Sequence, residues 1–153
     1  YSPTEFWVGA KYYQGTRSPN NAEREDIGYS SAWLHHKGRN KHHYEYWIDY
    51  SMQALPGGMA PVPMPDKYIA EMIMDRIAAS KVYMGDEYTD RSPLDYYYQG
   101  TDRAPIHPET KAKLLYVLEM LAEEGEEKTF RFIKEELVQH KRCMDWHQLE
   151  KAE

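Results

Sequence analysis

The sequence predicts an all-helical fold, a compact single-domain bundle formed by residues 1 to 153. Two observations predict it. In residues 66 to 84 the apolar side chains recur at the spacing of one helix face, and they are Ile69, Met72, Ile73 and Ile77. Within residues 108 to 146, two amphipathic stretches are joined by Gly125 alone. So short a link predicts an antiparallel helical hairpin.

The N-terminal part predicts two further helices. The first runs from residue 4 to about residue 14, with Thr4 as its N-cap and Gly15 just past its end. The second runs from residue 22 to residue 37, and Gly38 ends it.

The middle of the chain is less regular. A third, short helix is expected to start near Asn40 and to carry residues 42 to 50. Residues 55 to 65 are too rich in proline and glycine for regular structure. So long a loop is often functional, for example as a lid, and a plain surface crossover explains it equally well. Ser92 and Pro93 open one more short helix, which ends near Gly100.

Composition excludes several function classes. The chain carries 19 Lys and Arg against 25 Asp and Glu, a net charge of -6, which disfavours non-specific binding of nucleic acid. Its single cysteine, Cys143, excludes an intramolecular disulfide and fits a reducing cytoplasm. No apolar run approaches the roughly 20 residues of a membrane span, so no membrane partner is expected.

Histidines mark the candidate functional segment. Four of the seven fall within nine residues: His35, His36, His42 and His43. Histidine is the commonest side-chain metal ligand, so the pattern indicates a divalent metal site. An anion-binding surface shared with Lys37, Arg39 and Lys41 is a second interpretation. A wet patch of stacked polar aromatic rings without a site is the third.

Helix geometry limits how these histidines can meet. His35 and His36 are neighbours on a helix, so their side chains diverge by about 100°. After Gly38 the chain can turn and return His42 or His43 to the same point. Two imidazoles make only part of a site, because a catalytic metal usually has three or more protein ligands.

Asp75 is the best carboxylate candidate for completing that site. It lies within an otherwise apolar helix, and burying an unpaired carboxylate is costly. Glu71 precedes it by four residues and shares its face. A surface salt bridge of Asp75 is an equally good interpretation. His107, just before Pro108, is predicted to start a helix.

The segment from residue 32 to residue 47, Ala-Trp-Leu-His-His-Lys-Gly-Arg-Asn-Lys-His-His-Tyr-Glu-Tyr-Trp, resembles the hallmark of a bacterial and phage family of unknown function. Some of its members carry the label "catalase". Residues 1 to 6, residues 11 to 15 and the helix around Asp75 resemble it as well. That family is distantly similar to the HD-domain superfamily. These all-helical, metal-dependent proteins include phosphohydrolases and some di-iron oxygenases, so the resemblance implies an HD-domain-like bundle.

The resemblance also implies metal ligands. His35 and His36 resemble the paired histidines of the HD-GYP branch, and Asp75 resembles the late aspartate of the superfamily. In relatives a His-Asp-Leu-Ser-Lys stretch lies immediately before the Tyr-Ser-Pro with which this chain begins. If the natural protein carries that stretch upstream of Tyr1, two or three further ligands lie outside these 153 residues.

The leading hypothesis is a metal-dependent hydrolase of a phosphate ester or nucleotide. Its divalent ion (Mn, Fe, Zn or Mg) would be held by His35, His36, His43 and Asp75. Phosphate oxygens would be bound by Lys37, Arg39 and Lys41, and catalysis would be assisted by Lys37 and Glu71. The main alternative is a non-enzymatic phage or mobile-element protein that binds an anionic partner through the His/Lys/Arg segment. Di-iron redox chemistry is a third possibility.

Overall fold

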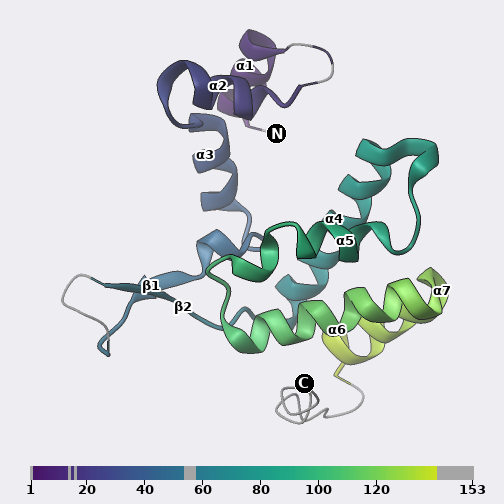
Figure 1. The fold of residues 1–153 in the computed structure, drawn as a ribbon. Helices are drawn as coiled ribbons and strands as arrows, with labels where there is room; N and C mark the ends of the chain where they lie inside the picture. The colour runs from purple at the N-terminus through teal and green to yellow at the C-terminus, as the bar shows by residue number, and fades with distance from the viewer. Residues whose placement is uncertain (1, 14, 16, 54–57, 141–153) are drawn as a thin grey trace. The chain divides into compact units, whose positions relative to one another are not determined.

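The computed structural model describes residues 2–13, 15, 17–53 and 58–140. The chain divides into two compact units, Tyr1–Tyr46 and Trp47–Glu153, and each is described by itself. Both are mostly helical, so the predicted helical class is confirmed, with the addition of a small sheet that the sequence did not predict (Figure 1). Their grouping into one domain stays a prediction.

The first unit is built on three helices, α1 (Pro3–Tyr12), α2 (Pro19–Ile27) and α3 (Ser31–Arg39), and α1 packs against the other two. The cap of α1 is Ser2, so the predicted cap Thr4 is wrong. Serine before proline is a strong start signal, because the serine oxygen accepts a backbone N–H and the proline has no N–H that would need an acceptor.

The predicted helix from residue 22 to residue 37 is wrong, because the chain breaks there into α2 and α3. Gly28 ends α2 in the left-handed conformation, with φ of 87°, and its N–H donates to the carbonyl of Arg24 at 2.8 Å. Glycine adopts this conformation without steric cost. Gly38 does not end α3, which continues through it to Arg39.

The predicted short helix over residues 42 to 50 is also wrong. A 3₁₀ turn, Tyr44–Tyr46, leads into strand β1 (Ile48–Tyr50), which pairs antiparallel with β2 (Met59–Pro61). Strand β2 lies inside the stretch predicted to be irregular, and residues 54 to 57 of that stretch lie outside the described residues. Strands of three residues are too short to reveal themselves by alternation of apolar and polar side chains.

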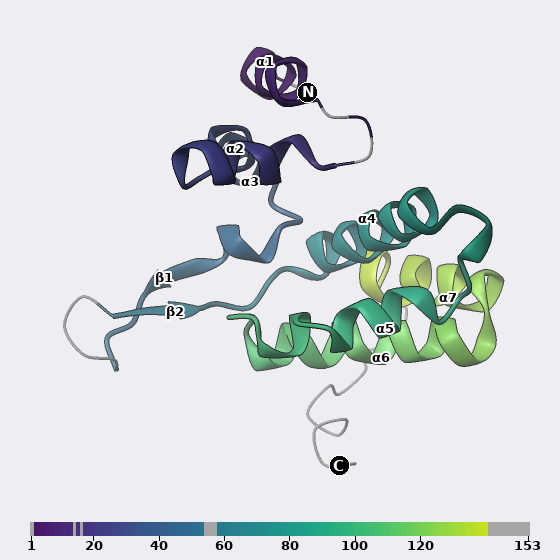
Figure 2. The ribbon, with the colours of Figure 1, turned by 45° about the horizontal axis from the view of Figure 1, so that its top comes forward.

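The second unit packs four helices beside this hairpin: α4 (Asp66–Met84), α5 (Ser92–Tyr98), α6 (Pro108–Glu124) and α7 (Glu126–Phe132). Figure 2 shows α5 lying along α6, and α6 in turn lies against α4 and α7. The predicted apolar stripe of α4 is buried, as expected. The fully buried core consists of Ile69, Ile73, Leu114, Val117, Leu118, Leu121 and Leu137.

Over the described residues α6 and α7 contact each other, and the antiparallel hairpin over residues 108 to 146 stays a prediction. His107 starts α6 as predicted, because its Nδ1 accepts the backbone N–H of Glu109 at 3.2 Å. Gly125 links the helices with φ of 85°. After α7 the chain continues as a π-helix, Ile133–Val138, and residues 141 to 146 of the predicted helix, with Cys143, lie outside the described residues.

None of the described helices combines the length and the apolar character that a membrane crossing requires.

Candidate metal centre

Helix α3 carries the first histidine of the candidate site, and buried polar groups fix where this helix begins. Its N-cap Ser30 accepts the N–H of Trp33 at 3.1 Å. Buried Glu23 accepts the hydroxyls of Ser30 at 2.8 Å and Ser31 at 2.5 Å. Burial alone would raise the pKa of Glu23. Hydrogen bonds from these hydroxyls bring the pKa below its usual value, and the bond from Ser31 has the larger effect. A charged carboxylate at the start of α3 also suits the helix dipole.

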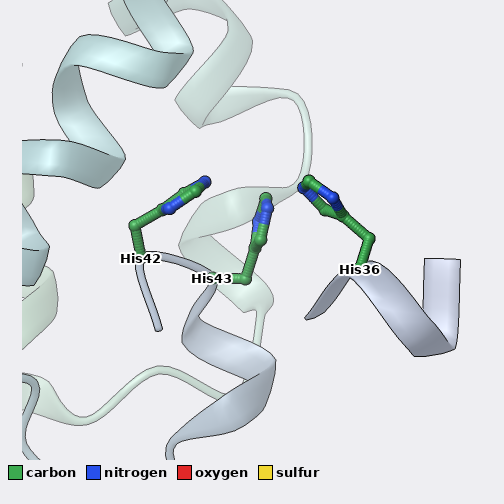
Figure 3. Close-up of side chains that lie close together, drawn as sticks. All are labelled: His36, His42 and His43. Carbon is green, nitrogen blue, oxygen red and sulfur yellow. The ribbon is translucent and has the colours of Figure 1, made fainter. Parts of the chain in front are cut away.

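A tight turn after α3 carries the next two histidines. The helix ends at Asn40, whose backbone is extended and whose Nδ2 donates to the carbonyl of His36 at 2.8 Å. The N–H of His43 then donates to the carbonyl of Asn40 at 3.3 Å, and the N–H of Tyr46 donates to the carbonyl of His43 at 3.1 Å. This reversal returns His42 and His43 toward the last turn of α3 (Figure 3).

The three histidines converge. One ring nitrogen from each of His36, His42 and His43 lies within 4.8 Å of the others. The ring centroids of His42 and His43 are 4.3 Å apart, those of His36 and His43 4.9 Å, and those of His36 and His42 6.3 Å. All three side chains are half-buried. Nitrogens bound to one zinc ion at about 2.0–2.1 Å lie within roughly 3.5 Å of one another, so these rings would have to move toward one another to hold one ion.

Trp33 forms an apolar wall beside the histidines. Its ring centroid lies 4.8 Å from that of His43, in an edge-on arrangement at 71°, and 5.8 Å from that of His36. Both histidines therefore pack on one rigid indole. A large ring in contact restricts the rotamers that His36 and His43 can adopt.

Glu5 reaches the cluster from helix α1. Its Oε1 lies 2.7 Å from Nδ1 of His36, and its Oε2 accepts the N–H of Ser2 at 2.6 Å. The Ser2 N–H is the main cause that lowers the pKa of Glu5 to about 2, against the effect of burial and with help from the Ser2 hydroxyl and His36. Because the carboxylate engages Nδ1, Nε2 is the nitrogen that His36 can offer to a cation.

His35 points elsewhere, as the helix geometry predicted. Its Nδ1 lies 3.1 Å from Oγ of Ser2, and it is not part of the convergent group. The structure therefore brings together two of the predicted ligands, His36 and His43, and adds His42. A ligand role for His35 stays a prediction from the sequence, and the proposal below takes His42 in its place.

The three basic residues lie on the same segment as the histidines. Lys37 is half-buried on α3, whereas Arg39 and Lys41 are exposed. The ammonium of Lys41 lies 5.5 Å from the ring centroid of Tyr46. Their predicted roles in binding substrate, and the catalytic role of Lys37, stay predictions.

Glu71 and Asp75 belong to the second unit. Both are exposed and lie one turn apart on α4. Asp75 as a metal ligand and Glu71 as a catalytic residue remain predictions.

The sequence interpretation missed two residues, His42 and Glu5. The sequence leaves open whether His42 or His43 returns to α3, and the hypothesis takes His43, whereas the turn lets both rings face α3. The spacing of Ser2 and Glu5 is the signature of a capping box, which can be predicted from the sequence. The contact of Glu5 with His36, 31 residues along the chain, cannot be predicted from that spacing.

Comparison with known proteins gives one match. The model of a family of unknown function, DUF5662, matches residues 1–120, which include every residue of the histidine cluster. No curated protein and no solved structure matches the chain.

Proposed function

The chain belongs to the family of unknown function DUF5662, and we propose that it is a metal-dependent hydrolase of phosphate esters. The proposal is carried by one observation, the convergence of His36, His42 and His43 within 4.8 Å. Three protein ligands around one ion are typical of catalytic zinc sites, which keep a further position open.

The donor set favours particular metals. Imidazole nitrogen suits Zn²⁺, Fe²⁺, Ni²⁺ and Cu²⁺, whereas Mg²⁺ and Mn²⁺ prefer oxygen ligands. Of the ions that the sequence suggested, zinc and iron therefore fit three histidines better than manganese or magnesium. A carboxylate such as Asp75, if it also binds, would move the preference toward iron, since two or more histidines with one carboxylate are a common non-haem iron set.

The basic segment supports a phosphate substrate. Lys37, Arg39 and Lys41 lie within four residues of a histidine ligand, and cations of this kind bind phosphate oxygens and offset the charge that builds on them. A bound divalent ion would lower the pKa of a coordinated water and polarise the phosphoryl group. In the reaction, a water molecule gives up one proton to solvent while its oxygen forms a bond to phosphorus, the ester P–O bond breaks, and the leaving alkoxide takes up a proton. Lys37 is the proposed donor of that proton.

The HD-domain relationship is part of the same proposal. Support comes from a mostly helical chain in which a helix ends at a histidine cluster, and from the sequence resemblance. In this proposal Asp75 is a further ligand and Glu71 orients water or a ligand histidine.

The test compares two alanine variants of protein purified without a histidine tag. His42→Ala should lose bound zinc and any chelator-sensitive hydrolysis of bis(p-nitrophenyl) phosphate. His35→Ala should keep both, because its ring contacts Ser2 instead. Equal metal binding by the wild-type protein and the His42 variant would contradict the ligand set. Metal binding without hydrolysis of any phosphate ester would leave a metal protein and defeat the hydrolase.

The alternative, an anion-binding protein without metal chemistry, is favoured by the same Lys37, Arg39 and Lys41. Salt and chelators separate the two functions. Binding of a phosphorylated partner through these cations should weaken steeply with ionic strength and ignore a chelator. Hydrolysis should stop with the chelator and return with zinc.

A further inference from the structure

We propose that Glu5 is the positioning residue of the metal centre: its carboxylate holds the proton of His36 on Nδ1 and so presents Nε2 to the cation. The inference rests on the proposed function, and it extends the site from α3 and the following turn to the N-terminal cap of α1. A ligand histidine commonly donates its second ring N–H to a carboxylate, which fixes the tautomer and makes the ligand nitrogen more basic.

Two distances decide which neighbour determines whether Nδ1 of His36 carries a proton. Nδ1 of His36 lies 2.7 Å from Oε1 of Glu5 and 3.4 Å from Nδ2 of Asn40. The two contacts require opposite states of the ring, because a carboxylate accepts a proton from Nδ1 whereas an amide nitrogen donates one to it. The contact with the carboxylate is short and involves a charge, so it is much the stronger. Asn40 has a better acceptor in the carbonyl of His36, at 2.8 Å.

The carboxylate is itself held in place. Its Oε2 accepts the N–H of Ser2 at 2.6 Å, and Oγ of Ser2 accepts the N–H of Glu5 at 3.3 Å, so the two residues form a reciprocal capping box. Only 11% of the Glu5 side chain is exposed. Each of its oxygens therefore has one assigned partner: one caps the helix, and the other orients His36.

A neighbouring contact ties the adjacent histidine to the same cap. Oγ of Ser2 also lies 3.1 Å from Nδ1 of His35. Both histidines of the pair on α3 are thus bonded to residues of the α1 cap, through different atoms. This places the two rings on different partners and leaves only His36 directed at His42 and His43.

The experiment reads the His36 tautomer directly, in metal-free protein, by two-bond ¹H–¹⁵N correlation NMR at mildly alkaline pH. In the wild type we expect the Nδ1–H form. In Glu5→Gln the side-chain amide can donate as well as accept, so we expect a mixture of tautomers. Zinc affinity of this variant should fall by about 10- to 100-fold, the usual effect of losing a partner that orients a ligand.

The matched control is Glu23→Gln. Glu23 is another buried glutamate of the first unit that caps a helix, but it bonds Ser30 and Ser31. Glu23→Gln should lower the stability of the unit and leave the His36 tautomer unchanged. The comparison therefore separates loss of His36 orientation from loss of stability. Circular dichroism checks that each variant is folded.

Three results would overturn the assignment. They are an Nε2–H tautomer in the wild type, an unchanged tautomer in folded Glu5→Gln, or equal loss of zinc affinity in both glutamine variants. The wild-type spectrum needs no variant to fold. If the wild type binds no metal at all, the hydrolase proposal fails, and the tautomer still decides whether Glu5 orients His36.

Discussion

The ring centroids of His36 and His43 lie 4.9 Å apart, at an interplanar angle of 60°. One residue is on the last turn of α3 and the other is in the reversal that follows it. Because the approach depends on a local turn, the first unit alone sets the geometry of three candidate ligands. A metal bound there would hold the turn against the helix.

Trp33 should report the binding of a metal. Its ring lies 4.8 Å from that of His43, so a paramagnetic Cu²⁺ or Co²⁺ ion held by the histidines would quench its fluorescence at short range. We expect saturable quenching with one equivalent of Cu²⁺ in the wild type, and most of that quenching to be lost in Trp33→Phe. The chain has three other tryptophans as internal references. Identical quenching curves for the two proteins would place the ion elsewhere.

The long helices could be predicted from the sequence, and the short elements could not. The apolar stripe of α4 and the single glycine between α6 and α7 are strong local signals. The stripe is buried in the structure, and Gly125 lies between the two helices. The break at Gly28 and the strands β1 and β2 were missed, because one glycine within a helical pattern is ambiguous and three residues show no period.

The residues of the histidine cluster could be predicted from the sequence only in part. Clustering of histidines indicates the segment in which His36 and His43, two of the predicted ligands, lie close together in the structure. The sequence places either His42 or His43 near α3, and it does not indicate the turn that lets both rings face the helix. Glu5 was omitted because its contact with His36 depends on how α1 packs against α3, which no local pattern encodes.

The ion pair of Lys113 should contribute measurably to the stability of the second unit. Its buried ammonium lies 2.7 Å from Asp66 and 3.1 Å from Glu109. Burial alone would lower the pKa of Lys113, but bonds to these two carboxylates raise it above its usual value. Lys113→Met leaves Asp66 largely buried without this cation, so we expect a loss of about 2 to 3 kcal/mol in the free energy of unfolding.

The matched control for Lys113 is Lys128→Met, which removes an exposed pair with Glu124 one turn away. Exposed pairs of this spacing contribute roughly 0.3–0.5 kcal/mol. Urea unfolding of the two variants gives the comparison. Equal losses would mean that the buried ion pair contributes no more to stability than the exposed one.

Tyr88 should make stability fall at alkaline pH. Burial, followed by the charges of Asp90 and Glu126, raises the pKa of Tyr88 to about 12. The unfolded chain, with a tyrosine pKa of about 10, therefore ionises first, and stability is lost as pH rises from about 10 to about 12. We expect this loss to reach about 1 kcal/mol in the wild type, since Tyr88 is only half-buried.

Tyr88→Phe is the comparison for that pH effect. Among the described residues no hydrogen-bond partner is found for the buried hydroxyl of Tyr88, so its removal should cost almost nothing at neutral pH. Urea unfolding measured from neutral pH to pH 12 should show a smaller alkaline decline in the variant. Parallel curves for the two proteins would contradict the raised pKa.

The stability of the second unit should depend on its buried core. Ile73 on α4 is completely buried, so Ile73→Ala should lower the free energy of unfolding by about 2 to 5 kcal/mol. Val82→Ala, on the same helix with 81% of the residue exposed, should change it by less than about 0.5 kcal/mol. Urea unfolding of the two variants gives the comparison, and similar losses in both would contradict the burial of Ile73.

The most direct test of the metal centre is a crystal structure of the protein grown with Zn²⁺, with diffraction data collected on both sides of the zinc absorption edge. The account predicts one anomalous peak about 2.0–2.1 Å from a ring nitrogen of each of His36, His42 and His43, with Nε2 as the ligand atom of His36. Zinc bound away from these three rings, or no zinc in crystals whose histidine cluster is accessible, would contradict it.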